Sequence, residues 1–218
     1  MPDLSFQIEG ASVVPFAVAP TVAFKLKISN AAADEAIHTV ALRCQIQIDV
    51  ARRRYSPQEQ ELMLDLFGVP ERWSQTLRSL LWTNVNLVIP GFPGAGTVAD
   101  LHVPCTFDFN VAATKYFAGL TDGDIPLLFL FSGTVFYVPP DGALQVAPIS
   151  WECEARFKLA VKVWREMMDS YYPNSVWLNV RRDVFDRLYR YKIQQGIPTW
   201  EEAPERVLPV ELEAMERS

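Results

Sequence analysis

Apolar and polar residues alternate with a period of two over most of the first 160 residues. In such a pattern one face of a β-strand packs on a core while the other face meets water. The alternation predicts four half-buried strands, at residues 22–28, 40–50, 101–109 and 149–157. In the last of these, Ile149, Trp151 and Cys153 fall on the core face.

Two further stretches, residues 125–131 and 134–138, are apolar on both faces, which predicts strands at the centre of a sheet or beneath a covering helix. Loops rich in Gly, Pro, Ala or Asp separate the strands, as is typical of antiparallel connections. Long antiparallel strands joined in this way favour a β-sandwich. We therefore expect an α+β, β-rich fold with an antiparallel β-sandwich in residues 1–160.

A helical insertion interrupts the strand pattern at about residues 56–82. Its first helix begins at Ser56, a good N-cap residue, followed by Pro57 at the first helical position. Glu59 stands where a capping box needs it, and Gly68 is a helix-stop residue. The sequence therefore predicts a capped helix that begins beside Ser56.

Three more helical segments follow from the pattern. Pro70 opens a second short helix with apolar positions as far as Leu81, and another short helix is expected at residues 111–120. After about residue 159 the apolar period becomes helical, so residues 161–200 are expected to form a C-terminal helical cap of the same domain. Residues 201–218, with six Glu against two Arg, are expected to form an acidic peripheral tail.

Composition places the chain among globular proteins. Hydrophobic residues make up 50% of the 218 residues and charged residues 21%, which excludes intrinsic disorder. The net charge of −6 speaks against nucleic-acid binding and against binding to anionic membranes, since both use Lys and Arg to neutralise phosphates. The basic run Arg52–Arg54 is interpreted as a solvated strand end in preference to an anion site.

Several features predict a cytoplasmic protein. The N-terminus lacks the basic and apolar regions of a signal peptide, and the longest apolar runs are too short for a membrane span. Cys44, Cys105 and Cys153 are isolated in the sequence and odd in number, which indicates a reducing compartment. All three fall on apolar strand faces, where they are interpreted as core residues.

The sequence offers weak candidates for chemistry. His102 shares the outward face of a predicted strand with Asp100 and Asp108, but a surface role is favoured over a catalytic or metal-binding one. The glycine-rich segment 91–97 lacks a following Lys and a helix, so an inter-strand loop is favoured over a phosphate-binding one. We therefore expect no catalytic, cofactor-binding or metal site.

The C-terminal region is rich in large amphipathic side chains interleaved with Arg. One interpretation is that these helices pack on the sandwich with their polar tips in water. The other is a protein-docking surface, because Trp, Tyr and Arg dominate interface hot spots. The candidate partner-binding residues are Tyr171, Tyr172, Trp177, Arg181, Arg182, Tyr189 and Trp200.

Several long phrases of the chain together carry a resemblance to a known family. They are residues 42–46, 70–73, 80–83, 105–109, 113–117, 126–137, 168–169 and 173–175. Over roughly residues 5–205 the chain resembles a bacterial family of unknown function, mainly actinobacterial, whose genes often lie beside those of high-affinity, oxygen-tolerant nickel–iron (NiFe) hydrogenases. No catalytic residues are established for that family, so the resemblance implies none here.

Three functions are carried forward. The first is a non-catalytic accessory or adaptor protein that binds another protein, with a hydrogenase subunit or maturation factor as the partner that the resemblance implies. The second is a small-molecule or lipid carrier, with the apolar run 125–137 lining a cavity between sandwich and cap. The third is an unrecognised enzyme that uses His102.

Overall fold

The computed structural model describes residues 2–32, 35–93, 95–107, 110–139, 142–175 and 178–207. The chain divides into two compact units, Met1–Ser175 and Val176–Ser218, which are described separately below. Whether residues 161–200 form one cap on the sandwich, and whether residues 201–218 form a peripheral tail, stay predictions.

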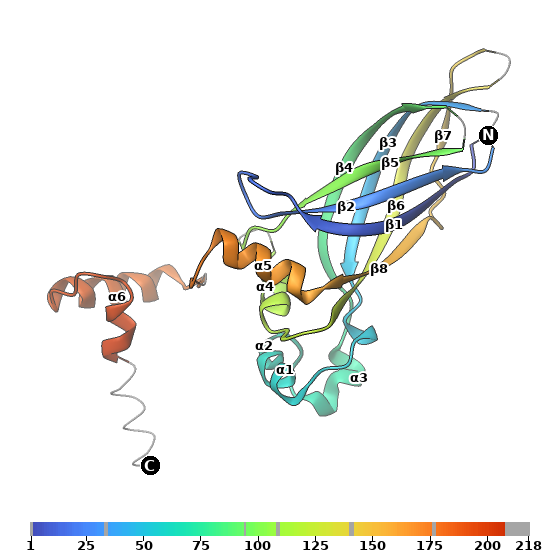
Figure 1. The fold of residues 1–218 in the computed structure, drawn as a ribbon. Coiled ribbons are helices and arrows are strands. Elements are labelled where there is room, and N and C mark those ends of the chain that lie inside the picture. Colours follow the sequence, from blue (N-terminus) through green and yellow to red (C-terminus); the bar gives the residue numbers. More distant parts are fainter. Residues whose placement is uncertain are drawn as a thin grey trace. The chain divides into compact units, whose positions relative to one another are not determined.

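The first unit contains two antiparallel sheets that face each other (Figure 1). The smaller sheet has the order β1–β2–β5, with bounds Leu4–Val13, Thr21–Asn30 and Gly96–Pro104. The larger sheet has the order β4–β3–β6–β7, with bounds Leu80–Phe92, Ala36–Ile48, Asp124–Val138 and Gln145–Pro148. β8 (Glu154–Ala160) also pairs with β6. The predicted β-rich antiparallel sandwich is confirmed.

Aromatic rings from both sheets fill the space between them. Phe6 of β1 stacks on Phe131 of β6, with ring centroids 4.5 Å apart. Phe24 of β2 packs edge-on against Phe129 of β6 at 5.1 Å. β6 lies between β3 on one side and β7 and β8 on the other, so its predicted central position is confirmed. Its inward side chains are buried because both neighbouring strands and the opposite sheet cover them.

The insertion is helical as predicted. It comprises η1 (Val50–Arg52), α1 (Pro57–Leu62), α2 (Leu64–Phe67), η2 (Pro70–Arg72) and α3 (Trp73–Thr76). The Ser56 hydroxyl accepts from the N–H of Glu59 while the Glu59 carboxylate accepts from the N–H of Ser56, which confirms the capping box. Gly68 ends α2 with a φ of 71°.

The second helix of the insertion is shorter than expected. α3 ends at Thr76, and Leu80 and Leu81 instead begin β4, where they pair with Ile48 and Gln47 of β3. A short apolar run such as residues 80–82 fits a helix or a strand equally well by periodicity. The free edge of β3 decides the matter, because it supplies hydrogen-bond partners to an extended chain.

The strand expected at residues 149–157 begins later than predicted, at Glu154. Trp151 lies in a turn between β7 and β8 and is 85% exposed, so its predicted position on the core face is wrong. The N–H of Cys153 donates to the carbonyl of Ser150 at 3.2 Å, which closes this turn. The apolar and polar residues alternate through the turn as they do in the strand. Alternation alone therefore could not show that the chain reverses direction before Glu154.

Helices cover one end of the sandwich. α4 (Val111–Ala118) confirms the short helix expected there, and its side packs against β4. α5 (Val161–Tyr171) contacts β1, β8 and α4. The strand expected at residues 101–109 ends at Pro104, where its partner β2 begins at Thr21, so the predicted end is wrong for residues 105–107. Asp108 and Phe109 lie outside the described residues. Among the described residues, no helix is both long and apolar enough to cross a membrane.

The second unit is helical. α6 (Arg182–Gln194) confirms the helix expected at about residues 181–195, and residues 202–207 form a further helical segment. Among the residues of this unit that the structure describes, Ile197 and Ala203 are buried apolar residues. Gly196 follows α6 with a φ of 62°, the left-handed conformation that commonly ends a helix.

Candidate functional site

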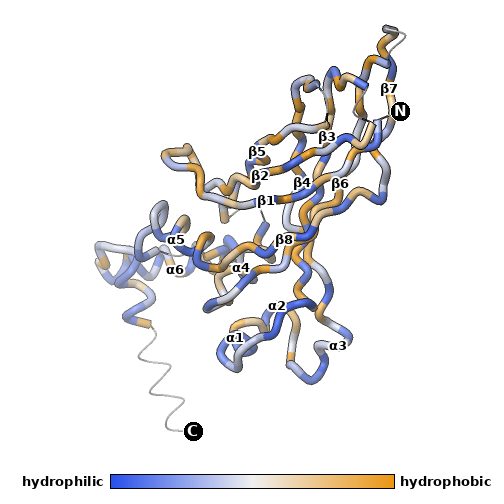
Figure 2. Tube along the Cα trace, turned by 45° about the vertical axis from the view of Figure 1, so that its right-hand side comes forward, coloured by the Kyte–Doolittle hydropathy of each residue, from blue (hydrophilic) through white to orange (hydrophobic). Residues whose placement is uncertain are grey.

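The loop between β1 and β2 is the most exposed apolar feature of the first unit. We call residues 14–20 the apolar loop, since every residue from Val13 to Pro20 is apolar. Phe16 is 103% and Val18 107% exposed, so neither side chain touches the core. The loop projects beyond the sheet in Figure 1 and carries hydrophobic colours at its tip in Figure 2.

Backbone and side-chain hydrogen bonds give the apolar loop a defined shape. The N–H of Val14 donates to the carbonyl of Thr21 at 2.9 Å and closes its base. The hydroxyl of Tyr171 in α5 donates to the carbonyl of Ala17 at 2.8 Å. Phe16 adopts a φ of 57°, a left-handed conformation that is uncommon for a bulky residue and costs free energy. The fold thus holds Phe16 outward in an unfavourable conformation.

One of the predicted partner-binding residues, Tyr171, contacts this loop, and its neighbour Tyr172 packs elsewhere. Tyr171 forms the hydrogen bond just described, and Tyr172 packs on Phe107 with ring centroids 5.1 Å apart. Tyr171 is the last residue of α5, which contacts β1, and Tyr172 caps that helix. The structure therefore gives Tyr171 a positioning role at the loop.

The second unit carries an exposed aromatic cluster formed by Phe185, Tyr189 and Trp200. The rings of Phe185 and Trp200 lie 5.2 Å apart, and those of Tyr189 and Trp200 lie 5.8 Å apart. Although the rings stack on one another, each residue remains 40–47% exposed. The ammonium of Lys192 lies 5.7 Å from the Trp200 ring centroid, within range of a cation–π contact.

The other predicted partner-binding residues are distributed around the start of α6. Arg181 makes two contacts with Asp183, at 3.0 and 2.8 Å, while Arg182 is exposed. The hydrogen bonds from Arg181 lower the pKa of the Asp183 carboxyl. Trp177 lies outside the described residues. Thus the structure brings together Tyr189 and Trp200, and it adds Phe185 to them.

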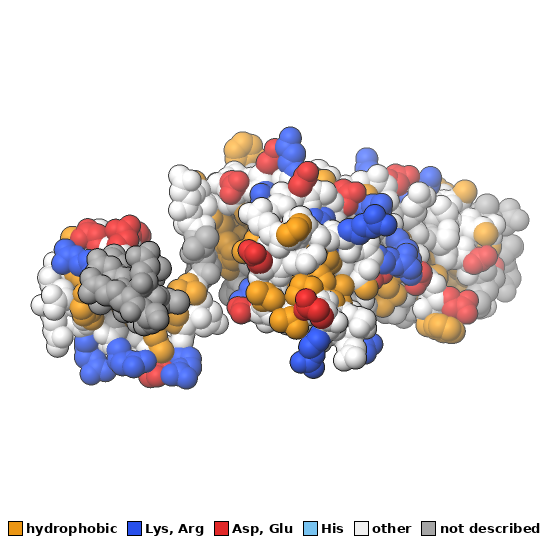
Figure 3. All heavy atoms as spheres, turned by 90° about the horizontal axis from the view of Figure 1, so that it is seen from below, with side chains coloured by type: hydrophobic (Ala, Val, Ile, Leu, Met, Phe, Trp, Pro, Cys, Tyr) orange, Lys and Arg blue, Asp and Glu red, His pale blue; other side chains and the backbone are white. Residues whose placement is uncertain are grey.

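A third exposed apolar surface lies on the helical insertion. Leu62, Leu64 and Val69 are 53%, 45% and 49% exposed. Seen from below, apolar side chains gather among charged ones on this face (Figure 3). These aliphatic residues present less area per side chain than Phe16.

Sequence reasoning missed the apolar loop. The available signal was a run of eight apolar residues, Val13 to Pro20, without the period of a strand or helix and with two prolines. No charged residue occurs between Glu9 and Lys25. Such a run is equally compatible with a buried segment, because the sequence does not encode whether an apolar loop faces the core or water.

The basic run Arg52–Arg54 is interpreted from the sequence as a solvated strand end, but the side chain of its middle residue is largely buried. The side chain of Arg53 is only 9% exposed and donates to the Glu59 carboxylate at 2.6 Å. It also donates to the carbonyls of Asp122 and Asp124. That interpretation is therefore wrong for Arg53, which joins the insertion to the start of β6, because the buried Glu59 carboxylate and two backbone carbonyls beside β6 converge on its guanidinium.

Burial raises the pKa of the Glu59 carboxyl, but hydrogen bonds from the N–H groups of Thr121 and Ser56 and from Arg53 outweigh it and leave the pKa below its usual value. Beside this pair, the hydroxyls of Tyr55 and Tyr116 lie 2.9 Å apart. Burial raises the pKa of Tyr55 to about 12. Both phenols therefore remain neutral and serve as hydrogen-bonding groups.

The residues considered for catalysis or metal binding belong to neither the apolar loop nor the aromatic cluster. His102 and Asp100 are exposed on the outer face of β5, while Asp108 lies outside the described residues. Burial raises the pKa of Cys44 and Cys105 to about 12, in line with core positions. Among the described residues, no three His, Cys, Asp or Glu side chains gather to hold a metal ion.

The carrier hypothesis placed a cavity between the sandwich and its cap, lined by the apolar run 125–137. Instead, Phe129 and Phe131 pack against Phe24 and Phe6 of the opposite sheet. Ile125 and Leu127 are likewise buried in the core cluster. The inward side of this strand is therefore occupied by protein side chains.

By its fold, this protein is a β-sandwich protein, and it exposes apolar and aromatic side chains at its surface. The chain belongs to a family of unknown function (DUF6084), whose model matches residues 1–216. The match agrees with the resemblance to a family of unknown function that the sequence showed over roughly residues 5–205. No curated protein matches the chain significantly.

Three solved structures show distant similarity. The CARDB domain of a Pyrococcus furiosus protein, in complex with di-metal ions, is 12% identical with a TM-score of 0.30, over 73% of this chain and 92% of that one. The putative ApaA protein from Bordetella pertussis is 16% identical with a TM-score of 0.28, over 73% and 94%. A β-glucosidase from Kluyveromyces marxianus is 10% identical with a TM-score of 0.26, over 72% and 15%. At TM-scores of this size, none of the three informs on function.

Proposed function

We propose that this protein is a non-catalytic accessory or adaptor protein that binds another protein through its apolar loop. The observation that carries the proposal is the wholly exposed Phe16, held outward with a φ of 57°. Strained residues persist where the surrounding structure fixes them, and they cluster at binding sites. Tyr171 fixes the loop here by its hydrogen bond to Ala17.

The expected free energy of binding is substantial for so small a loop. Burying a side chain such as Phe or Val in a partner pocket contributes about 1.5–3 kcal/mol. Because hydrogen bonds already order the loop, association would cost less conformational entropy than ordering a flexible segment. Phe16 is therefore the expected anchor, with Val18 beside it.

A protein partner is favoured over a membrane. Loops and helices that bind membrane surfaces usually combine apolar side chains with Lys or Arg that attract anionic lipids. Here no charged residue occurs between Glu9 and Lys25, and the whole chain carries a net charge of −6. An apolar pocket in another protein suits this loop better.

The partner that we propose is a hydrogenase subunit or maturation factor, on the strength of the family resemblance stated above. The compartment that we propose is the cytoplasm. Cys44, Cys105 and Cys153 are free thiols, and unpaired cysteines are typical of reducing compartments.

The test is affinity purification of the full-length tagged protein from its native host under hydrogen-oxidising conditions. Wild type is compared with Phe16→Asn, since Asn tolerates a positive φ and removes the apolar ring. Recovery of the partner should fall about tenfold or more, because each 1.4 kcal/mol of binding is tenfold. The thermal midpoint should stay the same or rise, since the strained aromatic residue is gone.

Trp151→Asn is the matched control. Trp151 is also a highly exposed aromatic residue, at 85%, but its turn lies near the start of β1 and the apolar loop follows the end of that strand. This variant should recover the partner as wild type does. Equal recovery by wild type and Phe16→Asn would contradict the proposal, and recovery of a partner unrelated to hydrogenases would contradict only its hydrogenase component.

The aromatic cluster is proposed as a second contact surface. Its three rings are 40–47% exposed, and the predicted Tyr189 and Trp200 belong to it. Trp200→Ser should lower partner recovery in the same purification. An undiminished recovery would restrict the binding role to the apolar loop.

A further inference from the structure

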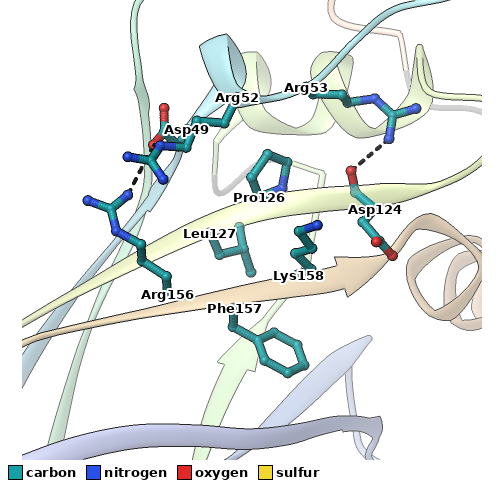
Figure 4. Close-up of a pocket in the computed structure, with 9 residues that line it drawn as sticks. All are labelled: Asp49, Arg52, Arg53, Asp124, Pro126, Leu127, Arg156, Phe157 and Lys158. Carbon is teal, nitrogen blue, oxygen red and sulfur yellow. Dashed lines mark hydrogen bonds and ion pairs between the residues drawn. The ribbon is translucent and has the colours of Figure 1, made fainter.

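A pocket with basic walls opens where the larger sheet meets the helical insertion. Its volume is about 770 Å³, a size typical of small-molecule sites. The strand pairs Pro126–Lys158 and Leu127–Phe157 of β6 and β8 line its floor. Asp49, Arg52, Arg53, Asp124 and Arg156 complete the lining, as Figure 4 shows.

Strand geometry places two cations side by side in this pocket. Arg156 and Lys158 are both exposed on one face of β8, two residues apart, which separates their Cα atoms by about 7 Å. Phe157 lies between them and points to the opposite face, where it packs on Phe24 at 5.9 Å. Alternation along β8 thus directs both positive charges to the outer side.

Asp49 holds two of the arginines in place. Its Oδ2 lies 3.0 Å from Nε of Arg52 and 3.3 Å from a terminal nitrogen of Arg156. Asp49 is largely buried, with an 18% exposed side chain, so this arrangement is well fixed. Glu154 also reaches Arg156, at 3.2 Å, but Glu154 does not line the pocket.

The remaining cations differ in how far they are neutralised. Arg53 is paired with the buried Glu59 and forms a wall. Lys158 has no ion pair or hydrogen bond among the residues that the structure describes. In Figure 4 its ammonium rises from the floor between Leu127 and Asp124. Four lining cations stand against two lining carboxylates, in a chain whose net charge is −6.

We infer that this pocket binds a small organic anion through Lys158, Arg52 and Arg156. The ligand carries a phosphate or carboxylate group, because guanidinium groups donate to such planar or branched oxyanions in pairs and an ammonium adds a point charge. Pro126, which pairs with Lys158 and is half-buried on the same outer face, supplies an apolar floor for the organic part of the ligand. The site is independent of the apolar loop and does not rest on the proposed adaptor role.

The test is calorimetric titration of the full-length protein at constant ionic strength with three probes. Phenyl phosphate and benzoate carry one apolar ring with a phosphate or a carboxylate, and inorganic phosphate lacks the ring. We expect saturable binding of phenyl phosphate or benzoate at one site, and the tighter of the two identifies the acidic group. Inorganic phosphate should bind more weakly than phenyl phosphate, because it lacks the ring that packs on the apolar floor.

Lys158→Gln should raise the dissociation constant of the probe that binds wild type at least about fivefold, since a hydrogen bond to a charged group is lost. Arg52→Gln should raise it as well, and this second variant removes a side chain that is 60% exposed. The matched control is Lys25→Gln, which makes the same charge change at an exposed position of β2. Lys25→Gln should bind as wild type does.

Three results would overturn the inference. One is that no probe binds wild type saturably. Another is that both Lys158→Gln and Arg52→Gln bind with wild-type affinity. The last is that Lys25→Gln weakens binding as much as Lys158→Gln, which would indicate a general effect of net charge.

Discussion

Arg53 and Glu59 form a buried ion pair that joins the helical insertion to the sandwich. Their side chains are 9% and 4% exposed, and the pair sits within a network of backbone donors and acceptors. Breaking a buried pair by removing one partner costs about 3–5 kcal/mol, because the other charge is left uncompensated. At the scale of single residues, this pair is therefore expected to be highly sensitive to substitution.

Glu59→Gln should lower the free energy of unfolding by about 3–5 kcal/mol near neutral pH. The pKa of Glu59 is lowered in the folded protein from an ordinary value of 4.5. The stability that ionised Glu59 contributes is therefore fully present above the unfolded pKa and is lost as pH falls through the folded pKa. Urea unfolding at several pH values should show the difference between wild type and variant shrinking below pH 4.5.

Glu61→Gln serves as the control for this change. Glu61 is exposed on the same helix, so its substitution should alter stability by less than about 0.5 kcal/mol. A Glu59→Gln difference that stayed constant from neutral to acidic pH would show that the carboxylate's charge does not stabilise the fold.

At the scale of elements, β6 has a feature that periodicity does not reveal. It pairs with β8 over residues 124–130 and with β7 over residues 134–137, so it changes partners near Gly133. Gly133 has a φ of 139°, and a Cβ there would lie 2.1 Å from the carbonyl oxygen of Ala41 in β3. Only glycine fits this position, because both the backbone conformation and the close approach of β3 exclude a side chain.

Gly133→Ala should destabilise the protein by about 3 kcal/mol or more, from backbone strain together with overpacking. Thermal or urea unfolding measures the effect. Gly10→Ala is the matched control, since Gly10 also lies in a strand but nothing comes within 4 Å of a Cβ built there. Similar stabilities for the two variants would mean that β3 and β6 separate at little cost.

The first unit should fold without the second. At the scale of the whole molecule, Met1–Ser175 contains both sheets, the insertion, α4 and α5. A protein ending at Ser175 should therefore unfold in one cooperative transition, with a midpoint close to that of the full chain. Circular dichroism during heating tests this. A fragment lacking cooperative unfolding would show that the C-terminal unit completes the core.

Local sequence determined much of the fold. Alternation located β2 and β3, because a strand with one buried face must repeat every second residue, and β6 was located by runs that are apolar on both faces. The helix beside Ser56 was predictable because capping depends on residues only three apart. β4 and the turn at Trp151 were not, since a short apolar run takes its conformation from the strand edge or turn that receives it.

The surfaces depended more on tertiary structure. The sequence by itself indicated Tyr189 and Trp200 as candidates for binding, because their residue types are common in interfaces. Only the fold decided that Phe16 is exposed, that Arg53 is buried, and that Arg52, Arg156 and Lys158 line one pocket. Burial and convergence of distant side chains arise from strand pairing between remote segments, and local periodicity does not encode that pairing.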